Sequence, residues 1–556
     1  MRIKILLNVF IAVFLCHFMG QAQDTLDVAP FTPDGELNLA PTIFSDTTET
    51  GERANLNRVY RLQRGQIYLM DQTVFADYPI RLVADGDDSQ RPPILVRGKY
   101  PTGDPIKTFF TFTGSNQSHS FKNIIFTGVD EDREYHNQWN RGLKIAGDNV
   151  ELHLTKCIMN AWAGLFLEVE GDNASLYIKD SEWRNGVGTQ GAPWGAQQTV
   201  VFSNHLKNLI VLNNTFFNTG GFWLFQEDGV ADSVKVEHNT LFTGVIDLLR
   251  MRDLVNADFR SNLFYGTHAY GQNQAERDAS WFDKDGQIIS MFSIDTSGVD
   301  LLASNGLTES DKRIVVSNNT YYSPQALQDW WATIPGLYTP VWMHDRTMAM
   351  FADDAAYPNL EAFDNFEMDP NFVDTDMATW VMDEVITYCS KTRNGFGSTT
   401  SPRNYDAHTG NSDVLLMPWP LPESLVYTNA DMLVGGHDGL PVGDLNWFPD
   451  KRAIYNEDGT VATHDLKKYT SVNVIDNISP NPASDKIFLD INFEQQTFAK
   501  IEVININGVV VKTLAGKKYT AGKNVIEIDV NEMATGAYSI KVSSENNVSA
   551  KRFIKH

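Results

Sequence analysis

The amino-acid sequence predicts an all-β protein in which a solenoid of parallel strands is followed by a small antiparallel β-sandwich. Two observations carry this prediction. Short apolar segments recur at steps of about 24 to 33 residues between residues 60 and 325, with one longer gap, as stacked repeats do. From residue 471 onward the pattern becomes a strict alternation of apolar and polar residues, interrupted by turn dipeptides such as Asn507-Gly508.

Each repeat contains two apolar residues separated by one position. The pairs are Leu152/Leu154, Leu176/Ile178, Leu209/Val211, Val234/Val236, Ala257/Phe259 and, less regularly, Ile314/Val316. Three residues after each pair come Cys157, Ser181, Asn214, Asn239, Asn262 and Asn319, and five residues after it come Met159, Trp183, Phe216, Leu241, Phe264 and Tyr321. Asparagines buried at a fixed bend can bond to their counterparts above and below, and the following row can stack inside the core. Both rows are therefore expected to be scaffold.

The repeat resembles the right-handed parallel β-helix of the pectate-lyase-like superfamily, with the asparagine row as a ladder between the second and third sheets. The segment Leu62-Gln63-Arg64-Gly65-Gln66-Ile67-Tyr68-Leu69 resembles the usual first coil of such helices. The resemblance implies a β-helix over residues 60–325, preceded by an N-terminal extension at 23–59. It does not imply one activity, because the superfamily is functionally mixed.

Residues 326–456 are expected to form a flank and C-terminal cap of the β-helix, followed by a linker at 457–470. The elements Asp369-Pro370-Asn371-Phe372 and Gly443-Asp444-Leu445-Asn446-Trp447 resemble closing segments of secreted β-helix proteins of Bacteroidota. Asp431, Asp438 and Asp444 are weak calcium candidates, because calcium prefers several oxygen ligands from flexible loops. Turn and cap roles for these three residues are the alternative.

The segment 471–556 carries several motifs in a fixed order. They are Asn477-Ile478-Ser479-Pro480-Asn481-Pro482, Asn505-Ile506-Asn507-Gly508, Thr535-Gly536-Ala537-Tyr538 and Lys551-Arg552-Phe553-Ile554-Lys555. This combination resembles the type A sorting domain of the type IX secretion system of Bacteroidota. The resemblance implies the type IX secretion machinery as a partner. It also implies a final location outside the cell or anchored at the outer-membrane surface, after removal of a signal peptide and of this domain.

The N-terminus agrees with export. Arg2 and Lys4 precede an apolar run over residues 5–19, and Gly20-Gln21-Ala22 supplies a small-residue cleavage site, so residues 1–22 read as a secretory signal peptide. We expect no transmembrane segment in the mature chain, because no other apolar run is long enough. Cys157 and Cys389 remain after cleavage and are expected to be buried free thiols.

The negative net charge of the chain bears on which partners it can bind. The chain has 556 residues, 42% of them hydrophobic, and a formal net charge of −25 that lies entirely upstream of Ser471. Such an acidic field repels nucleic acid at long range and argues against nucleic-acid binding. We expect a monomer.

Chemistry is expected on the outer face of the first sheet of the β-helix. One short turn before each aligned pair lie predicted strands at residues 142–147, 164–170, 199–203, 221–227 and 245–252. With Leu143, Leu167 and Val200 inside, alternation places a mixed set outward: Lys144, Phe166, Glu168, Glu170, Thr199, Ser203, Trp223, Phe225 and Glu227. In the last strand either Arg250 and Arg252 or Asp247 face outward, and the arginines are preferred because burying a guanidinium is costly.

Two long loops, at residues 129–140 and 185–198, feed this sheet and favour a functional role. A groove lined by aromatic rings and amides would suit stacking on sugar rings. The predicted substrate-binding residues are Trp139, Trp194, Trp223, Phe225 and Gln197. Aromatic packing under the loops is the alternative.

Three functions fit this pattern. A polysaccharide lyase needs a base and a cation, for which Arg250, Arg252, Lys144 and His205 are candidates, with calcium possible on Glu168, Glu170 and Glu227. A glycoside hydrolase needs paired carboxylates, for which Glu168, Glu170, Glu227 and Asp228 are candidates. A non-catalytic surface protein that binds polysaccharide or mediates adhesion requires neither. The sequence favours an exported carbohydrate-active protein and leans toward an enzyme.

Overall fold

A computed structural model describes residues 24–32, 39–100, 102–134, 141–162, 164–186, 198–220, 224–226, 229–246, 249–251, 253–278, 288–294, 299–394, 404–457, 474–493, 496–505, 510–544 and 548–556. The predicted signal peptide and residues 458–470 of the predicted linker lie outside these ranges. The chain divides into two compact units, Met1–Glu361 with Glu367–Arg452, and Ala362–Phe366 with Ala453–His556.

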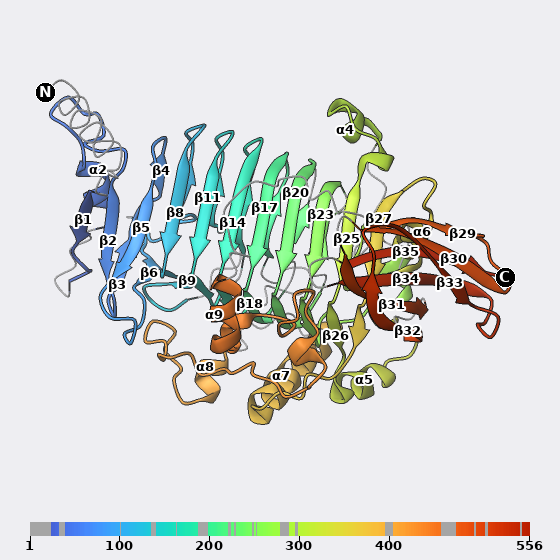
Figure 1. The fold of residues 1–556 in the computed structure, drawn as a ribbon. Coiled ribbons are helices and arrows are strands. Elements are labelled where there is room, and N and C mark those ends of the chain that lie inside the picture. Colours follow the sequence, from blue (N-terminus) through green and yellow to red (C-terminus); the bar gives the residue numbers. More distant parts are fainter. Residues whose placement is uncertain are drawn as a thin grey trace, which may run out of the picture. The chain divides into compact units, whose positions relative to one another are not determined.

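The larger unit is a parallel β-helix, as the sequence predicted, and its successive coils build three parallel sheets (Figure 1). The first sheet contains β4 (Val74–Ala76), β7 (Phe110–Phe112), β10 (Arg141–Ile145), β13 (Leu165–Val169), β16 (Gln198–Phe202), β19 (Leu224–Gln226) and β22 (Leu249–Arg250). The second sheet contains β1 (Thr25–Val28), β2 (Val59–Gln63), β5 (Arg81–Asp85), β8 (Ser118–Lys122), β11 (Glu151–Thr155), β14 (Ala174–Lys179), β17 (Leu206–Leu212), β20 (Ala231–Glu237), β23 (Leu254–Arg260) and β25 (Arg313–Ser317). The third sheet contains β3 (Ile67–Met70), β6 (Ile94–Arg97), β9 (Ile125–Asp130), β12 (Ile158–Asn160), β15 (Glu182–Arg184), β18 (Thr215–Thr219), β21 (Thr240–Gly244), β24 (Leu263–Tyr265) and β26 (Thr320–Tyr322). Two short strands, β27 (Asn359–Phe363) and β28 (Phe366–Glu367), straddle the boundary between the units.

The asparagine ladder is present at the predicted positions, between the second and third sheets. Asn239 Nδ2 donates to Asn262 Oδ1 at 2.9 Å and to the carbonyl oxygen of Val211 at 3.0 Å. Asn239 Oδ1 in turn accepts from the side-chain amide of Asn214 at 2.9 Å and from its backbone N–H at 3.1 Å. The same bonds join Asn262 to Asn319. Each side chain thus satisfies backbone groups at the bend that would otherwise be buried without partners.

The predicted register of the coils is also confirmed. The apolar pairs align across the second sheet in the order Leu152, Leu176, Leu209, Val234, Ala257 and Ile314. The row two residues beyond the ladder aligns across the third sheet, and its members are buried except Tyr321, which is partly exposed. Within this row, Trp183 and Phe216 stack with ring centroids 4.8 Å apart. Cys157 and Cys389 are buried, and neither forms a disulfide.

The described helices lie before, within and after the series of β-helix coils in the chain. At the N-terminal end, α2 (Leu39–Ser45) accompanies β1, which extends the second sheet beyond the first coil. The remaining helices are α3 (Gln274–Asp278), α4 (Val299–Ser304), η3 (Glu309–Asp311), α5 (Gln325–Ala332), α6 (Asp345–Ala352), α7 (Thr375–Arg393), α8 (Tyr405–His408), η4 (Met432–Val434), η5 (Leu445–Trp447) and α9 (Pro449–Glu457). Among the described helices, none combines the length and the apolar character needed to cross a bilayer.

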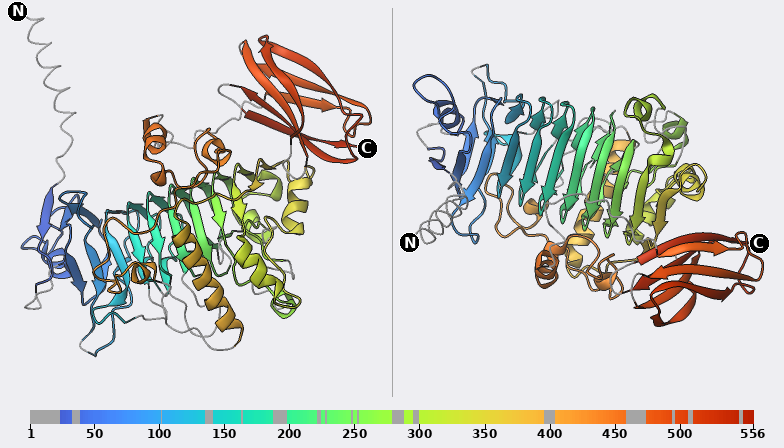
Figure 2. Two further views of the ribbon diagram at one scale, coloured as in Figure 1. Left: turned by 90° about the horizontal axis from the view of Figure 1, so that it is seen from below. Right: turned by 45° about the horizontal axis from the view of Figure 1, so that its top comes forward.

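The helix α7 covers the outer face of the third sheet (Figures 1 and 2). Its N-cap residue Asp374 accepts a hydrogen bond from the backbone of Met377, and basic residues occupy its last turn, as the helix dipole favours. Its apolar side packs with Phe217, Phe242 and Tyr265, whose rings point outward from successive coils. The sequence predicted this region as a flank and cap but did not predict its helices.

A buried charge cluster also joins this flank to the third sheet. The guanidinium of Arg184, a side chain with no exposed surface, donates to both oxygens of Asp406 at 2.6 and 2.7 Å and to Glu423 at 2.6 Å. Burial and the neighbouring Glu423 carboxylate raise the pKa of Glu182 well above its usual value. Removing one member would therefore leave uncompensated charge inside the protein.

The smaller unit is the predicted antiparallel β-sandwich. One sheet has the order β29 (Ile475–Ser479), β30 (Lys486–Phe493) and β33 (Gly522–Asp529), and the other has β32 (Val510–Tyr519), β31 (Thr497–Asn505), β34 (Gly536–Ser544) and β35 (Val548–Lys555). Alternate side chains of the strands, among them Ile487, Leu489 and Ile491 of β30, form a separate buried core. The alternation from residue 471 onward therefore reflects one buried and one wet face in each sheet.

Replacing Asn239 by alanine should destabilise the β-helix by about 1–3 kcal/mol, because ladder partners on both sides are left unpaired. All twelve tryptophans precede Ala453, so tryptophan fluorescence follows the unfolding of the larger unit alone. Asn208→Ala is the matched control, because Asn208 lies on the neighbouring strand β17 and is only partly buried. Equal unfolding midpoints for Asn239→Ala and the control would contradict the ladder.

Candidate functional site

The described part of the first sheet carries a charged network on its outer face. The apolar residues Leu143 and Leu167 are buried and pair across the sheet, which places Lys144 opposite Glu168 on the other face. Glu168 accepts two hydrogen bonds from Arg141, at 2.6 and 2.7 Å, and its Oε2 lies 3.3 Å from Lys144 Nζ. Lys144 also donates to Glu170 at 2.6 Å. Neighbouring coils are thus linked by alternating charges, here called the Glu168 network.

The network determines the charge state of Glu168. Burial raises the pKa of this carboxyl, but the hydrogen bond from Arg141 and the charges of Arg141 and Lys144 outweigh burial and lower the pKa below its usual value. Glu168 is therefore ionised at neutral pH and can accept a proton or act as a nucleophile. It is unsuited to general acid catalysis, which needs a raised pKa.

The alternation pattern fails at Phe166, which the sequence predicted to point outward. Its side chain is completely buried and packs edge-to-face against Phe126 and Trp162, with ring centroids 5.3 and 5.4 Å apart. The partner residue Gly142 explains the exception. A Cβ atom at position 142 would lie 2.5 Å from the ring of Phe166, so the missing side chain leaves the space that the ring fills.

The predicted catalytic candidate His205 has no described contact with the Glu168 network. It sits at the bend after β16, where its Nε2 lies 2.8 Å from Asp232 Oδ1. The contact with Asp232 gives His205 a structural role at this turn.

The other predicted catalytic and substrate-binding residues are not part of the described site. Trp139, Trp194, Gln197, Trp223, Glu227, Asp228 and Arg252 lie outside the described residues. The backbone of Phe225 belongs to β19 and that of Arg250 to β22, but the structure does not describe these two side chains.

The three weak calcium candidates lie along the cap segment 431–447, here called the strap. Asp444 is buried, and its carboxylate accepts from Thr215 Oγ1 at 2.7 Å and from the backbone of Asn446 at 2.9 Å. Burial raises the pKa of Asp444 to about 7, although these hydrogen bonds oppose the rise. Asp431 is exposed. Asp438 contacts His238 instead, with Nε2 and Oδ2 3.1 Å apart.

Sequence reasoning missed the two histidines beside Asp438. Among the described residues, His238, His437 and Asp438 form the one group of three side chains whose ligand-type atoms all lie within 4.8 Å of one another. Two signals were available in the sequence: His238 directly precedes the ladder residue Asn239, and Gly435-Gly436-His437-Asp438-Gly439 brings flexible backbone to two ligand-type residues. Only the fold brings together positions 200 residues apart.

The molecule is thus a parallel β-helix protein with an appended antiparallel β-sandwich. The sandwich is a sorting domain: residues 477–556 match the family of secretion system C-terminal sorting domains. The resemblance to a type IX secretion signal is therefore confirmed, and the protein is secreted or displayed at the cell surface. No curated protein matches the sequence.

Removing residues 471–556 should abolish export to the surface while leaving the β-helix folded, because the larger unit and the sandwich have separate cores. Export is measured by surface proteolysis of intact cells, and folding by the tryptophan fluorescence of the truncated chain. A reporter that carries residues 1–22 at its N-terminus and residues 471–556 at its C-terminus is the reciprocal control and should be exported. Normal surface display of the truncated protein would contradict this role.

Asp444→Asn should stabilise the larger unit increasingly as the pH rises from about 4 to 8, by on the order of 1–3 kcal/mol. In the folded protein the pKa of Asp444 is about 7, above its ordinary 3.8. The neutral carboxyl therefore favours folding at low pH, and this contribution is lost as the pH rises through 7. Asparagine is neutral throughout. The measurement is the fluorescence unfolding midpoint against pH, with Asp431→Asn as the exposed control, and a pH-independent difference would refute the assignment.

Proposed function

We propose that this exported β-helix protein engages a polysaccharide on the outer face of its first sheet. The observation that supports the proposal most directly is the Glu168 network, which places charged hydrogen-bonding groups on successive coils. Parallel strands repeat at roughly 4.8 Å, so such a row offers regularly spaced donors and acceptors to an extended polymer. Charged groups held in place by one another bind sugar hydroxyl groups without having to reorganise.

The network favours a polymer without strong negative charge. A lyase must neutralise the carboxylate of a uronic acid with a cation. In the described part of the sheet, Arg141 and Lys144 are already paired with Glu168 and Glu170. The large negative net charge of the chain also disfavours an anionic polymer. Binding of a neutral polysaccharide is therefore the first candidate function.

Glycoside hydrolysis is the second candidate, because the ionised Glu168 lies on the outer face of the first sheet, opposite Lys144 of the neighbouring coil. An ionised carboxylate can serve as the base or the nucleophile. The general acid would have to come from another residue, for which we propose Glu227. In this mechanism Glu168→Gln would abolish turnover, whereas in a pure binding protein there is no turnover to lose.

Lys144→Ala and Glu168→Gln should each weaken binding of a neutral polysaccharide by about 1–3 kcal/mol, because each removes a charged hydrogen-bonding partner. Binding is measured by affinity electrophoresis over a panel of neutral and anionic polysaccharides, with new reducing ends and ultraviolet absorbance recorded with and without calcium. Lys207→Ala is the matched control, because Lys207 is exposed on β17 of the second sheet. Unchanged binding by both variants, with wild-type unfolding midpoints, would exclude this face as the site.

A further inference from the structure

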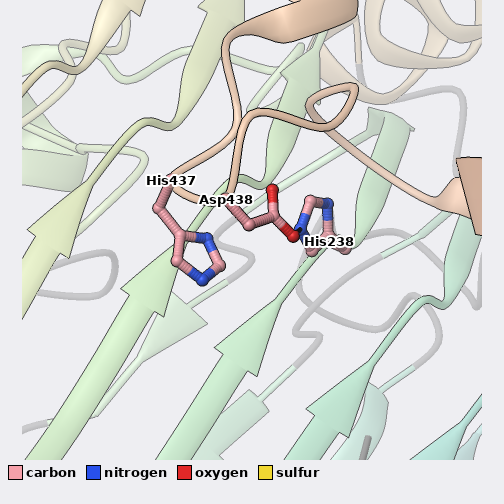
Figure 3. Close-up of side chains that lie close together, drawn as sticks. All are labelled: His238, His437 and Asp438. Carbon is pink, nitrogen blue, oxygen red and sulfur yellow. Dashed lines mark hydrogen bonds and ion pairs between the residues drawn. The ribbon is translucent and has the colours of Figure 1, made fainter. Parts of the chain in front are cut away.

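His238, His437 and Asp438 come together where the strap crosses the bends between the second and third sheets. His238 lies between β20 and β21, and the other two residues lie in the strap, within the same unit of the chain. Figure 3 shows the Asp438 carboxylate turned toward the His238 ring, with the ring of His437 on its other side. The His238 side chain has no exposed surface, and those of His437 and Asp438 are 24% and 17% exposed.

The surroundings of His238 determine which ring nitrogen carries a proton. Its Nδ1 lies 3.1 Å from the carbonyl oxygen of Pro441 and 3.3 Å from that of Gly443. Carbonyl oxygens can only accept, so Nδ1 is a donor. In the neutral ring Nε2 then presents a lone pair to Asp438 Oδ2, at 3.1 Å. Two lone pairs at this distance need either a proton or a metal ion between them.

His437 is oriented by its own hydrogen bonds. Its Nδ1 lies 2.8 Å from Ser261 Oγ, and its backbone N–H donates to the same oxygen at 2.9 Å. Ser261 belongs to the bend of the next coil. The buried carboxylate of Glu237 lies 3.9 Å from His437 Nε2 and adds negative charge beside the cluster. Fixed orientation by neighbouring hydroxyl and carboxylate groups is typical of histidines that bind metals.

Gly436 allows the strap backbone to pass directly against the cluster. A Cβ atom at this position would lie 2.9 Å from Asp438 Oδ1, 3.3 Å from His238 Cε1 and 2.6 Å from the carbonyl oxygen of Leu440. The first and last distances are too short for any side chain to be tolerated without movement. Glycine at this position therefore closes the cluster on one side.

We propose that His238, His437 and Asp438 bind a divalent transition metal ion, with zinc as the expected ion. Two imidazoles and one carboxylate suit zinc, whereas calcium prefers oxygen ligands alone. With zinc–ligand distances of about 2.0–2.1 Å, ligand atoms in a tetrahedral site lie roughly 3.3 Å apart. The separation of 3.1 Å between His238 and Asp438 is close to this value. The ion would fasten the strap to the β-helix, since its ligands come from segments 200 residues apart.

The test uses the untagged full-length chain, stripped with a chelator and titrated with zinc chloride, cobalt chloride and calcium chloride by calorimetry. We expect one zinc ion per chain, a cobalt complex with the visible absorption of tetrahedral coordination, a higher unfolding midpoint with zinc, and no competition by calcium. His437→Gln and Asp438→Asn should each raise the zinc dissociation constant tenfold or more. Asp431→Asn, which changes an exposed carboxylate of the same strap, should leave it unchanged.

Two outcomes would overturn the proposed zinc site: no saturable zinc binding by the wild-type chain, or binding that His437→Gln and Asp438→Asn leave unaltered. The first outcome would mean that His238 and Asp438 contact each other directly, without a metal ion between them. Unfolding midpoints of the metal-free variants show whether each variant is folded, and the double variant serves as the baseline for adventitious binding.

Discussion

The buried ladder of hydrogen bonds at the bend between the second and third sheets is the constraint on which the rest of the β-helix depends. Side chains such as Asn239 satisfy backbone groups of the coils on both sides, so a change of register by one residue would leave several buried groups without partners. Because the ladder holds the coils in one register, the apolar rows align inside, and charged residues of the first sheet, such as Lys144 and Glu168, meet across neighbouring strands.

The cap is joined to this scaffold by polar groups as well as by apolar packing. Arg184 projects outward from the third sheet and is neutralised by Asp406 and Glu423 of the flank. Farther along, the strap follows the bends of the coils, where Asp444 accepts from Thr215 and Asp438 meets His238. Buried polar contacts of this kind contribute little net stability when complete, but each is costly to break, so they select one placement of the cap.

The parts of the structure that could be predicted are those in which one local rule repeats. The ladder positions and the strand register follow from the fixed spacing between the apolar pair and the ladder residue, and this spacing recurs from coil to coil. The helix α7 could not be predicted in this way, because it belongs to no repeat. Its apolar side packs on the outward aromatic row of the third sheet, and this packing is defined only once the β-helix has folded. Phe166 was predicted outward because alternation ignores the space that Gly142 leaves on the neighbouring strand. The cluster around Asp438 joins distant segments, and no local pattern encodes such a meeting.

The ladder bond between Asn262 and Asn319 spans 57 residues of sequence, whereas that between Asn239 and Asn262 spans 23, yet both amide contacts measure 2.9 Å. The stacking of coils is thus indifferent to the length of the chain that leaves the bend and returns to it. In evolutionary terms, segments can be inserted or lost between consecutive ladder residues while the stacking of the coils stays unchanged. For the engineer, the interval between β24 and β25 is a position at which a foreign module could be grafted for presentation outside the cell.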